Sequence, residues 1–341
     1  MKSVLLYLLV MLAPLLLARP APAESLVRSG YQEAVFSVRD AGGYADFFGE
    51  VGGWERLHEG PVARELLRSW GLPEQASGFE IVVGNPGTTR GYVRLVQFLG
   101  VQQRQIRSNA QSWDTGGFFD VNARVLDMES QFVALQARDW QAASDPVQFS
   151  FGPFVVEEWL ARGPDGIVLA LIERIEPPLE GWPHLRQVSR LFNATQVVSD
   201  IEAAKHFYIE QLGFKVYLEN RGTSTEPGLN VLGMPHNIAT QAERVVYILH
   251  PDAVNEGSVE LLQFEGLRGA DFSAHAVPPN LGILMLRFPV ADIDAFAALV
   301  KRENIEVAMQ PTRVELAPYG HARLMAVRGP EGVWLEFFEL E

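Results

Sequence analysis

Short apolar strands alternate with amphipathic helical stretches along this chain, and the same three-residue step joins them four times. Each copy is a valine, a variable residue and an aspartate, placed where an apolar run ends and helical periodicity begins. An aspartate at such a position caps the first turn of the following helix. The four steps are Val38-Asp40, Val125-Asp127, Val198-Asp200 and Val290-Asp292. The pattern predicts four copies of one β-α-β unit.

The segments after these steps also repeat, which supports a duplicated chain. The stretch 91–100 matches 257–266 at six of ten positions, and 162–173 matches 328–339 at six of twelve. Such repeats indicate an architecture built from one recurring unit. Helices are predicted at 41–51, 128–140, 201–212 and 293–304. Later strands are predicted at 93–98, 168–172, 214–218, 244–250, 259–264 and 333–338.

The units form two tandem pairs. Units one and two are predicted to make an N-terminal domain, 24–176, and units three and four a C-terminal domain, 189–341. Between them lies 177–188, which is rich in proline and glycine and has no apolar period, as is typical of an interdomain linker.

Residues 1–23 have the pattern of a secretory signal peptide. Lys2 precedes an apolar run from Val4 to Leu17, and Ala21-Pro22-Ala23 is a small-residue cleavage site. The run is too short for a stable membrane span, and the chain has no cysteine for a lipid anchor or a disulfide. We therefore expect a periplasmic or secreted protein that is free of the membrane after cleavage.

The charge of the chain narrows the possible partners. The formal net charge is −14, and loss of Lys2 and Arg19 with the signal peptide would make it more negative. An acidic protein repels nucleic acid and anionic membrane surfaces, so neither is an expected partner. The chain also lacks P-loop, G-x-S-x-G and zinc-finger spacings.

The third unit resembles the opening of a vicinal oxygen chelate module. The resemblance rests on Val198-Ser199-Asp200, the Phe207-Tyr208 pair on the helix, and Leu212-Gly213-Phe214 after it. The ending 328–338, RGPEGVWLEFF, is similar to the closing segment of the same superfamily, which includes glyoxalase I, extradiol dioxygenases and bleomycin-resistance proteins. The resemblance implies an α+β fold of tandem βαβββ modules, in two domains that each curl a sheet into an open cup.

The resemblance also implies a site in the C-terminal pair. Active members hold a divalent metal on the first and last strands of two modules, and the equivalent positions here are Asn193, Glu260, Met285 and Glu336. Glu260 and Glu336 are the expected ligands of one Fe, Mn, Zn or Ni ion, with Asn193 binding substrate or adding an oxygen. The alternative is a metal-free polar cup, in which the glutamates hydrogen-bond inside the cup or pair with Arg287.

The N-terminal pair has Glu33, Arg94, Asp120 and Ala170 at the same positions. Arg94 would already supply a positive charge between the carboxylates, in place of a metal ion. This half is therefore interpreted as a structural or ligand-shaping domain. The alternative is anion recognition by Arg94 and Arg124.

Two further residues are candidates for a site. His321 precedes a strand expected beside the one that holds Glu336, where a histidine would transfer protons at neutral pH. Tyr247 and Arg287 are candidate substrate-binding residues, although strand aromatics are more often core.

These observations leave three functional hypotheses. The first is an exported metal-assisted lyase, isomerase or dioxygenase that acts on a small oxygenated molecule in the C-terminal cup. The second is a metal-free protein that binds or sequesters a small molecule, and the third is a non-catalytic scaffold, because a fold does not fix a function. A monomer or a homodimer is compatible with each.

Overall fold

The structure is a computed structural model that describes residues 25–341. The predicted signal peptide, 1–23, lies outside the described residues. No helix in the described part of the chain is long and apolar enough to cross a membrane.

The described chain forms four successive modules in which a strand and a helix precede three further strands. Module 1 contains β1 (Glu33–Ser37), α1 (Ala41–Gly52), β2 (Glu55–Pro61), α2 (Arg64–Ser69), β3 (Ser77–Gly84) and β4 (Tyr92–Leu99). Module 2 contains β5 (Asp120–Val125), α3 (Met128–Gln136), β6 (Val147–Phe151), β7 (Phe154–Arg162) and β8 (Val168–Glu176).

Modules 3 and 4 repeat this order. Module 3 contains β9 (Val188–Val197), α4 (Ile201–Lys205) continued by the π-helical turn His206–Gln211, β10 (Lys215–Gly222), α5 (His236–Ala239), β11 (Arg244–His250) and β12 (Ser258–Phe264). Module 4 contains β13 (Gly282–Pro289), α6 (Ile293–Arg302), β14 (Val307–Leu316), β15 (Gly320–Arg328) and β16 (Trp334–Leu340). The predicted βαβββ modules and the α+β class are therefore confirmed.

The repeated aspartates cap the helices as predicted. Asp40 accepts a hydrogen bond from the backbone of Gly43, and Asp127 and Asp200 do the same three residues ahead. Asp292 accepts from two backbone amides at the start of α6. Each cap satisfies backbone donors that the first turn leaves unpaired, which explains why the step recurs.

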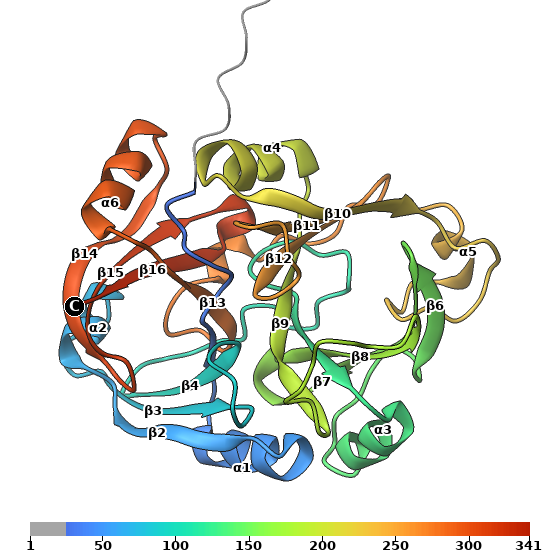
Figure 1. The fold of residues 1–341 in the computed structure, drawn as a ribbon, viewed down its shortest axis with the longest axis horizontal. Helices are drawn as coiled ribbons and strands as arrows, with labels where there is room; N and C mark the ends of the chain where they lie inside the picture. Colours follow the sequence, from blue (N-terminus) through green and yellow to red (C-terminus); the bar gives the residue numbers. More distant parts are fainter. Residues whose placement is uncertain (1–24) are drawn as a thin grey trace, which may run out of the picture.

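The modules pair differently from the prediction. One sheet has the order β14-β15-β16-β13-β1-β4-β3-β2 and joins modules 1 and 4, and the other has the order β10-β11-β12-β9-β5-β8-β7-β6 and joins modules 2 and 3. Figure 1 shows these two sheets side by side. The prediction that consecutive modules share one cup is wrong, and each cup takes one module from either side of the segment 177–188.

The pairing follows from the free edge of each first strand. The strand β1 pairs in parallel with β4 of its own module, which leaves its other edge to pair antiparallel with β13. In the second sheet β5 pairs antiparallel with β9 in the same way. A free strand edge can pair with another strand, but the apolar pattern of a strand does not identify which one. We call the sheet of modules 1 and 4 the first cup and that of modules 2 and 3 the second cup.

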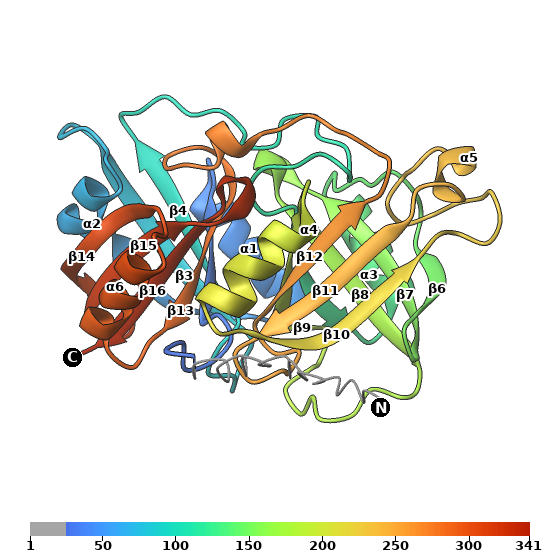
Figure 2. The ribbon, with the colours of Figure 1, turned by 90° about the horizontal axis from the view of Figure 1, so that it is seen from above.

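A continuous core joins the two cups. Its largest cluster contains side chains from all four modules. Phe288 on β13 contacts Tyr31 near β1 and Phe214 from module 3, with ring centroids 6.2 and 5.8 Å apart. The helices pack on the sheets, as α6 does on β14 and β15, and Figure 2 shows the arrangement from above.

Candidate functional site: a polar cavity in the second cup

The interior of the first cup is filled by protein side chains. Leu66 and Leu67 of α2, with Trp70 just after it, pack against Met285 and Trp334 on the sheet in one buried apolar cluster. Met285, at one of the four expected metal positions, is part of this core. These side chains occupy the concave face of the sheet as apolar core.

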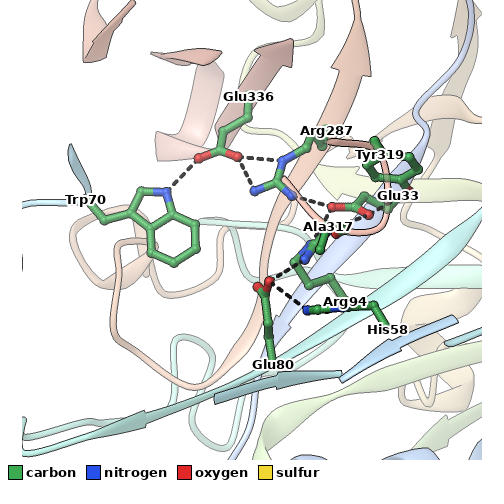
Figure 3. Close-up of polar contacts among 9 residues, drawn as sticks. All are labelled: Glu33, His58, Trp70, Glu80, Arg94, Arg287, Ala317, Tyr319 and Glu336. Carbon is green, nitrogen blue, oxygen red and sulfur yellow. Dashed lines mark hydrogen bonds and ion pairs between the residues drawn. The ribbon is translucent and has the colours of Figure 1, made fainter. Parts of the chain in front are cut away.

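A chain of ion pairs crosses the first cup, and Figure 3 shows its members. Arg287 Nε donates to Glu336 Oε2 over 2.7 Å, and Arg287 Nη1 donates to Glu33 Oε1. Arg94 Nε donates to the same Glu33 oxygen over 2.7 Å. All four side chains are 0% exposed. Carboxylates and guanidinium groups therefore alternate in a buried interior.

Neighbouring groups complete this network. Trp70 Nε1 donates to Glu336 Oε1 over 2.6 Å, and Tyr319 Oη donates to Glu33 Oε2 over 2.8 Å. Arg94 also lies 2.7 Å from Glu80 Oε1. Burial alone would raise the pKa of Glu33, but Arg94 and Arg287 together hold that pKa below its usual value. The network keeps Glu33 ionised, and its ion pairs with Arg94 and Arg287 are structural.

These contacts correct the roles predicted for two residues. Both oxygens of Glu336 are occupied, by Trp70 and by Arg287, and Arg287 has no exposed surface. Glu336 is therefore not placed as a metal ligand, and Arg287 is not placed to bind substrate. The alternative prediction was that the glutamates pair with Arg287. Glu336 does so, but Glu260 does not, because it lies in the other sheet. The prediction of a single site that contains both glutamates is wrong.

The second cup encloses a cavity of about 700 Å³. Asn193 and Glu260, two of the predicted site residues, line this cavity. Three other kinds of side chain line it as well: carboxylates, arginines and aromatic rings. They include Asp120, Glu158, Arg124, Arg174, Arg221, Arg244, Phe149, Phe154, Phe192 and Tyr217. Ligand cavities in proteins have this size and this mixture of apolar walls with a few polar groups.

The carboxyl groups of Asp120, Glu158 and Glu260 act on one another. Asp120 and Glu260 lie opposite Thr195 on its two neighbouring strands. Burial raises the pKa of Asp120 to about 6, although hydrogen bonds from Thr195 and Asn122 oppose the rise. Burial and the charge of Asp120 raise the pKa of Glu158 to about 8, and burial with both neighbours raises the pKa of Glu260 well above its usual value. At neutral pH Glu158 therefore favours the protonated, uncharged form, and the pKa of Glu260 is shifted in the same direction.

An asparagine amide lies between two of the expected metal positions. Asn122 Nδ2 is 3.0 Å from Asp120 Oδ1 and 3.1 Å from Asn193 Oδ1. The four equivalent positions in this cup are Asp120, Ala170, Asn193 and Glu260, and the alanine offers no ligand atom. Within residues 25–341 no group of three or more His, Cys, Asp or Glu side chains is arranged to hold a metal. The donor set does not fit the Fe, Mn, Zn or Ni ion that the resemblance implied.

The two remaining predicted residues do not line the cavity. His321 is exposed near the start of β15, opposite Glu315, in the sheet of the first cup. Tyr247 Oη donates to Glu219 Oε1 over 2.7 Å, and Lys205 of α4 lies 4.5 Å from its ring centroid. His321 lies in the other sheet, and Tyr247, although it is opposite Leu261 on the strand next to Glu260, does not line the cavity, so the predicted constellation does not form.

Sequence reasoning missed Glu158, Arg174 and Asn122. The segment Val156 to Leu160 contains two consecutive glutamates, and strand alternation places Glu158 on the face of Val156 and Leu160. That face points into the cup, whereas Trp159 packs in the core on the other side. The alternation could have predicted that Glu158 shares a face with Val156 and Leu160. That this face lines a cavity follows only once modules 2 and 3 are known to share a cup.

Comparisons with known proteins agree with this architecture. The model of the Glyoxalase/Bleomycin resistance protein/Dioxygenase superfamily matches residues 190–337, which span modules 3 and 4. Glyoxalase I from Zea mays is similar in structure, with a TM-score of 0.57 and 15% identity over 91% of this chain and 92% of that one. A "putative dioxygenase" from Bacillus subtilis has a TM-score of 0.56 and 14% identity over 92% of this chain and 85% of that one. No curated protein sequence matches significantly.

At these identities the structural neighbours establish the fold alone, and the family model adds a sequence match over residues 190–337. Residues 25–341 have the glyoxalase-like fold of tandem βαβββ modules, and modules 3 and 4 match the Glyoxalase/Bleomycin resistance protein/Dioxygenase superfamily in sequence.

Proposed function

We propose that this protein binds a small polar organic molecule in the second cup through its own side chains. One observation supports this most strongly: the second cup has a cavity of about 700 Å³ lined by polar and aromatic groups, whereas core and ion pairs fill the first. The proposal corresponds to the metal-free branch of the superfamily. It gives the two cups different tasks, ligand binding in one and structural support in the other.

The proposal does not require a resident metal. A bound divalent ion would supply Lewis-acid chemistry, but the Asn122 amide already bonds the facing oxygens of Asp120 and Asn193. Those oxygens together with the carboxyl group of Glu158, which is largely protonated at neutral pH, offer a ligand both acceptors and donors. Hydroxyl and carbonyl groups of a small oxygenated molecule are matched to such a surface.

Proton transfer is a second candidate function, favoured by two carboxyl groups that face one cavity. Asp120 with a pKa of about 6 and Glu158 with a pKa of about 8 differ in protonation near neutral pH, as an acid and base pair requires. Deuterium exchange from solvent into 2-oxoaldehydes or hydroxyketones, followed by NMR, tests this. Exchange that is unchanged in Glu158→Gln would contradict a role for that carboxyl.

We also propose that the protein works outside the cytoplasm. The support is the signal-peptide pattern of residues 1–23 together with the absence of cysteine from the sequence. A ligand would then come from the periplasm or the surroundings of the cell.

Calorimetric titration with catechols, 2-oxoaldehydes and aromatic antibiotics tests the binding proposal. A cavity-blocking variant, Ile172→Trp, adds bulk at a lining position, and Val133→Trp adds the same ring on an exposed position of α3. We expect a binder from the panel to lose at least tenfold in affinity with Ile172→Trp and nothing with Val133→Trp. A binder that is indifferent to both would place the site elsewhere, and silence across the panel would favour a scaffold.

A further inference from the structure

We propose that Arg124 and Arg174 form a subsite for an anionic group, a carboxylate or a phosphate, on the molecule that the second cup binds. This inference rests on the proposed binding function and adds the chemical class of the ligand. The pair lies where the main cavity meets a second one, of about 470 Å³, beside the segment 177–187.

Arg124 is buried without a counter-ion. It projects from β5, is 6% exposed, and forms no ion pair within 4 Å among residues 25–341. Its Nε is buried and has no hydrogen-bond partner in the described chain. The guanidinium carbon lies 4.2 Å from the centroid of the Phe192 ring, so one face of the group stacks on an aromatic ring. A buried cation with an unpaired Nε donor is a costly arrangement unless a ligand completes it.

Arg174 repeats this arrangement on the adjacent strand β8. Its guanidinium lies 3.8 Å from the centroid of the Phe154 ring, and its Nε is likewise unpaired. The two arginines repel each other: burial and the charge of Arg174 lower the pKa of Arg124 to about 10. Two like charges held together at a cavity define a position that an anion would stabilise.

The nearby carboxyl groups form no ion pair with these two arginines. Glu158 lies opposite Ile172, which lies opposite Arg124; the charges of Glu158 and Arg124 act on each other's pKa, but no ion pair within 4 Å joins them in residues 25–341. Glu256, in the second cavity, is paired with Arg190 over 2.8 Å. Glu180, in the same cavity, belongs to the exposed linker.

Part of the wall of the main cavity is apolar. Leu160, Val246, Ile248 and Leu262 line the cavity and belong to one hydrophobic cluster. A ligand with an apolar or aromatic body and one acidic group would therefore match both the apolar wall and the arginines. The arginines would receive the acid, and the body would lie among the aliphatic side chains.

Two fluorescent probes distinguish the contribution of the ligand's negative charge to binding from that of its apolar rings. 8-Anilinonaphthalene-1-sulfonate carries one negative charge, and N-phenyl-1-naphthylamine has the same rings without it. We expect Arg124→Gln and Arg174→Gln each to weaken binding of the sulfonate probe by about tenfold or more and to leave the neutral probe unchanged. Arg221→Gln is the matched control, because Arg221 also lines the cavity but is already paired with Glu243.

Competition then distinguishes the two anions. Displacement of the sulfonate probe by benzoate more than by phenyl phosphate assigns a carboxylate site, and the reverse assigns a phosphate site. Equal sulfonate affinity in wild type and both arginine variants, or displacement by neither competitor, would overturn the subsite. Neutral-probe binding that persists unchanged in Ile172→Trp would instead contradict the proposed cavity itself, so the two failures are distinguishable.

Discussion

Replacing Arg287 by methionine should destabilise the protein strongly, because this guanidinium connects two buried carboxylates. It contacts Glu336 through Nε at 2.7 Å and Nη2 at 2.5 Å, and it also donates to Glu33. After the substitution Glu33 keeps Arg94 and Tyr319, whereas Glu336 keeps only the Trp70 indole. The variant therefore leaves one carboxylate in the core without a cation.

The magnitude follows from the complete burial of these groups. Breaking a buried ion pair by removing one partner costs about 3–5 kcal/mol, since the remaining charge is uncompensated. The double variant Arg287→Met, Glu336→Gln removes that charge and keeps an amide oxygen for Trp70. We expect it to recover more than half of the loss, because neutral hydrogen bonds contribute only about 0.5–1.5 kcal/mol each.

Urea unfolding followed by tryptophan fluorescence gives the free energies by linear extrapolation. Arg323→Met is the control, because Arg323 pairs with Asp294 on the surface, and such pairs contribute little. We expect no measurable change for it. A loss below about 1 kcal/mol for Arg287→Met, or a double variant less stable than the single one, would refute the structural role of the network.

Three further predictions concern the second cup and the N-terminus. Because the folded protein raises the pKa of Glu158 to about 8, the wild type should lose stability relative to Glu158→Gln as the pH rises from about 4.5 to 8, and parallel urea curves across this range would contradict the shift. Elemental analysis after reconstitution with Fe, Mn, Zn or Ni should find well below one metal per chain in wild type and in Glu260→Gln alike; a full equivalent that Glu260→Gln removes would restore the metalloenzyme hypothesis. N-terminal sequencing of protein from a periplasmic extract should begin at Glu24, and a chain that retains Met1 would exclude cleavage.

The sequence predicted the modules because their signals are local. An aspartate three residues before the amide that it caps, as with Asp200 and Ala203, depends on neighbouring residues alone. The pairing of β1 with β13 spans most of the chain and depends on which free edges meet during folding. No pattern within a module contains that information, so the consecutive modules were paired wrongly.

The wrong pairing of the modules also limited the prediction of the site. Asn193 and Glu260 were placed correctly as cup residues, because both belong to module 3. Their partner Asp120 was assigned to a separate domain, although β5 lies next to β9 in the second sheet. Once the pairing of the modules is known, the family's metal positions on the first and last strands bring Asp120, Asn193 and Glu260 into one cavity.

The division of tasks between the cups is the central claim, and the position of a bound probe tests it most directly. A crystal structure of the protein with 8-anilinonaphthalene-1-sulfonate should show the probe inside the second cup, among β5, β7, β9 and β12. The side chains of Glu33, Arg94, Arg287 and Glu336 in the first cup should remain paired and without ligand. A probe bound in the first cup in place of those contacts would contradict the account.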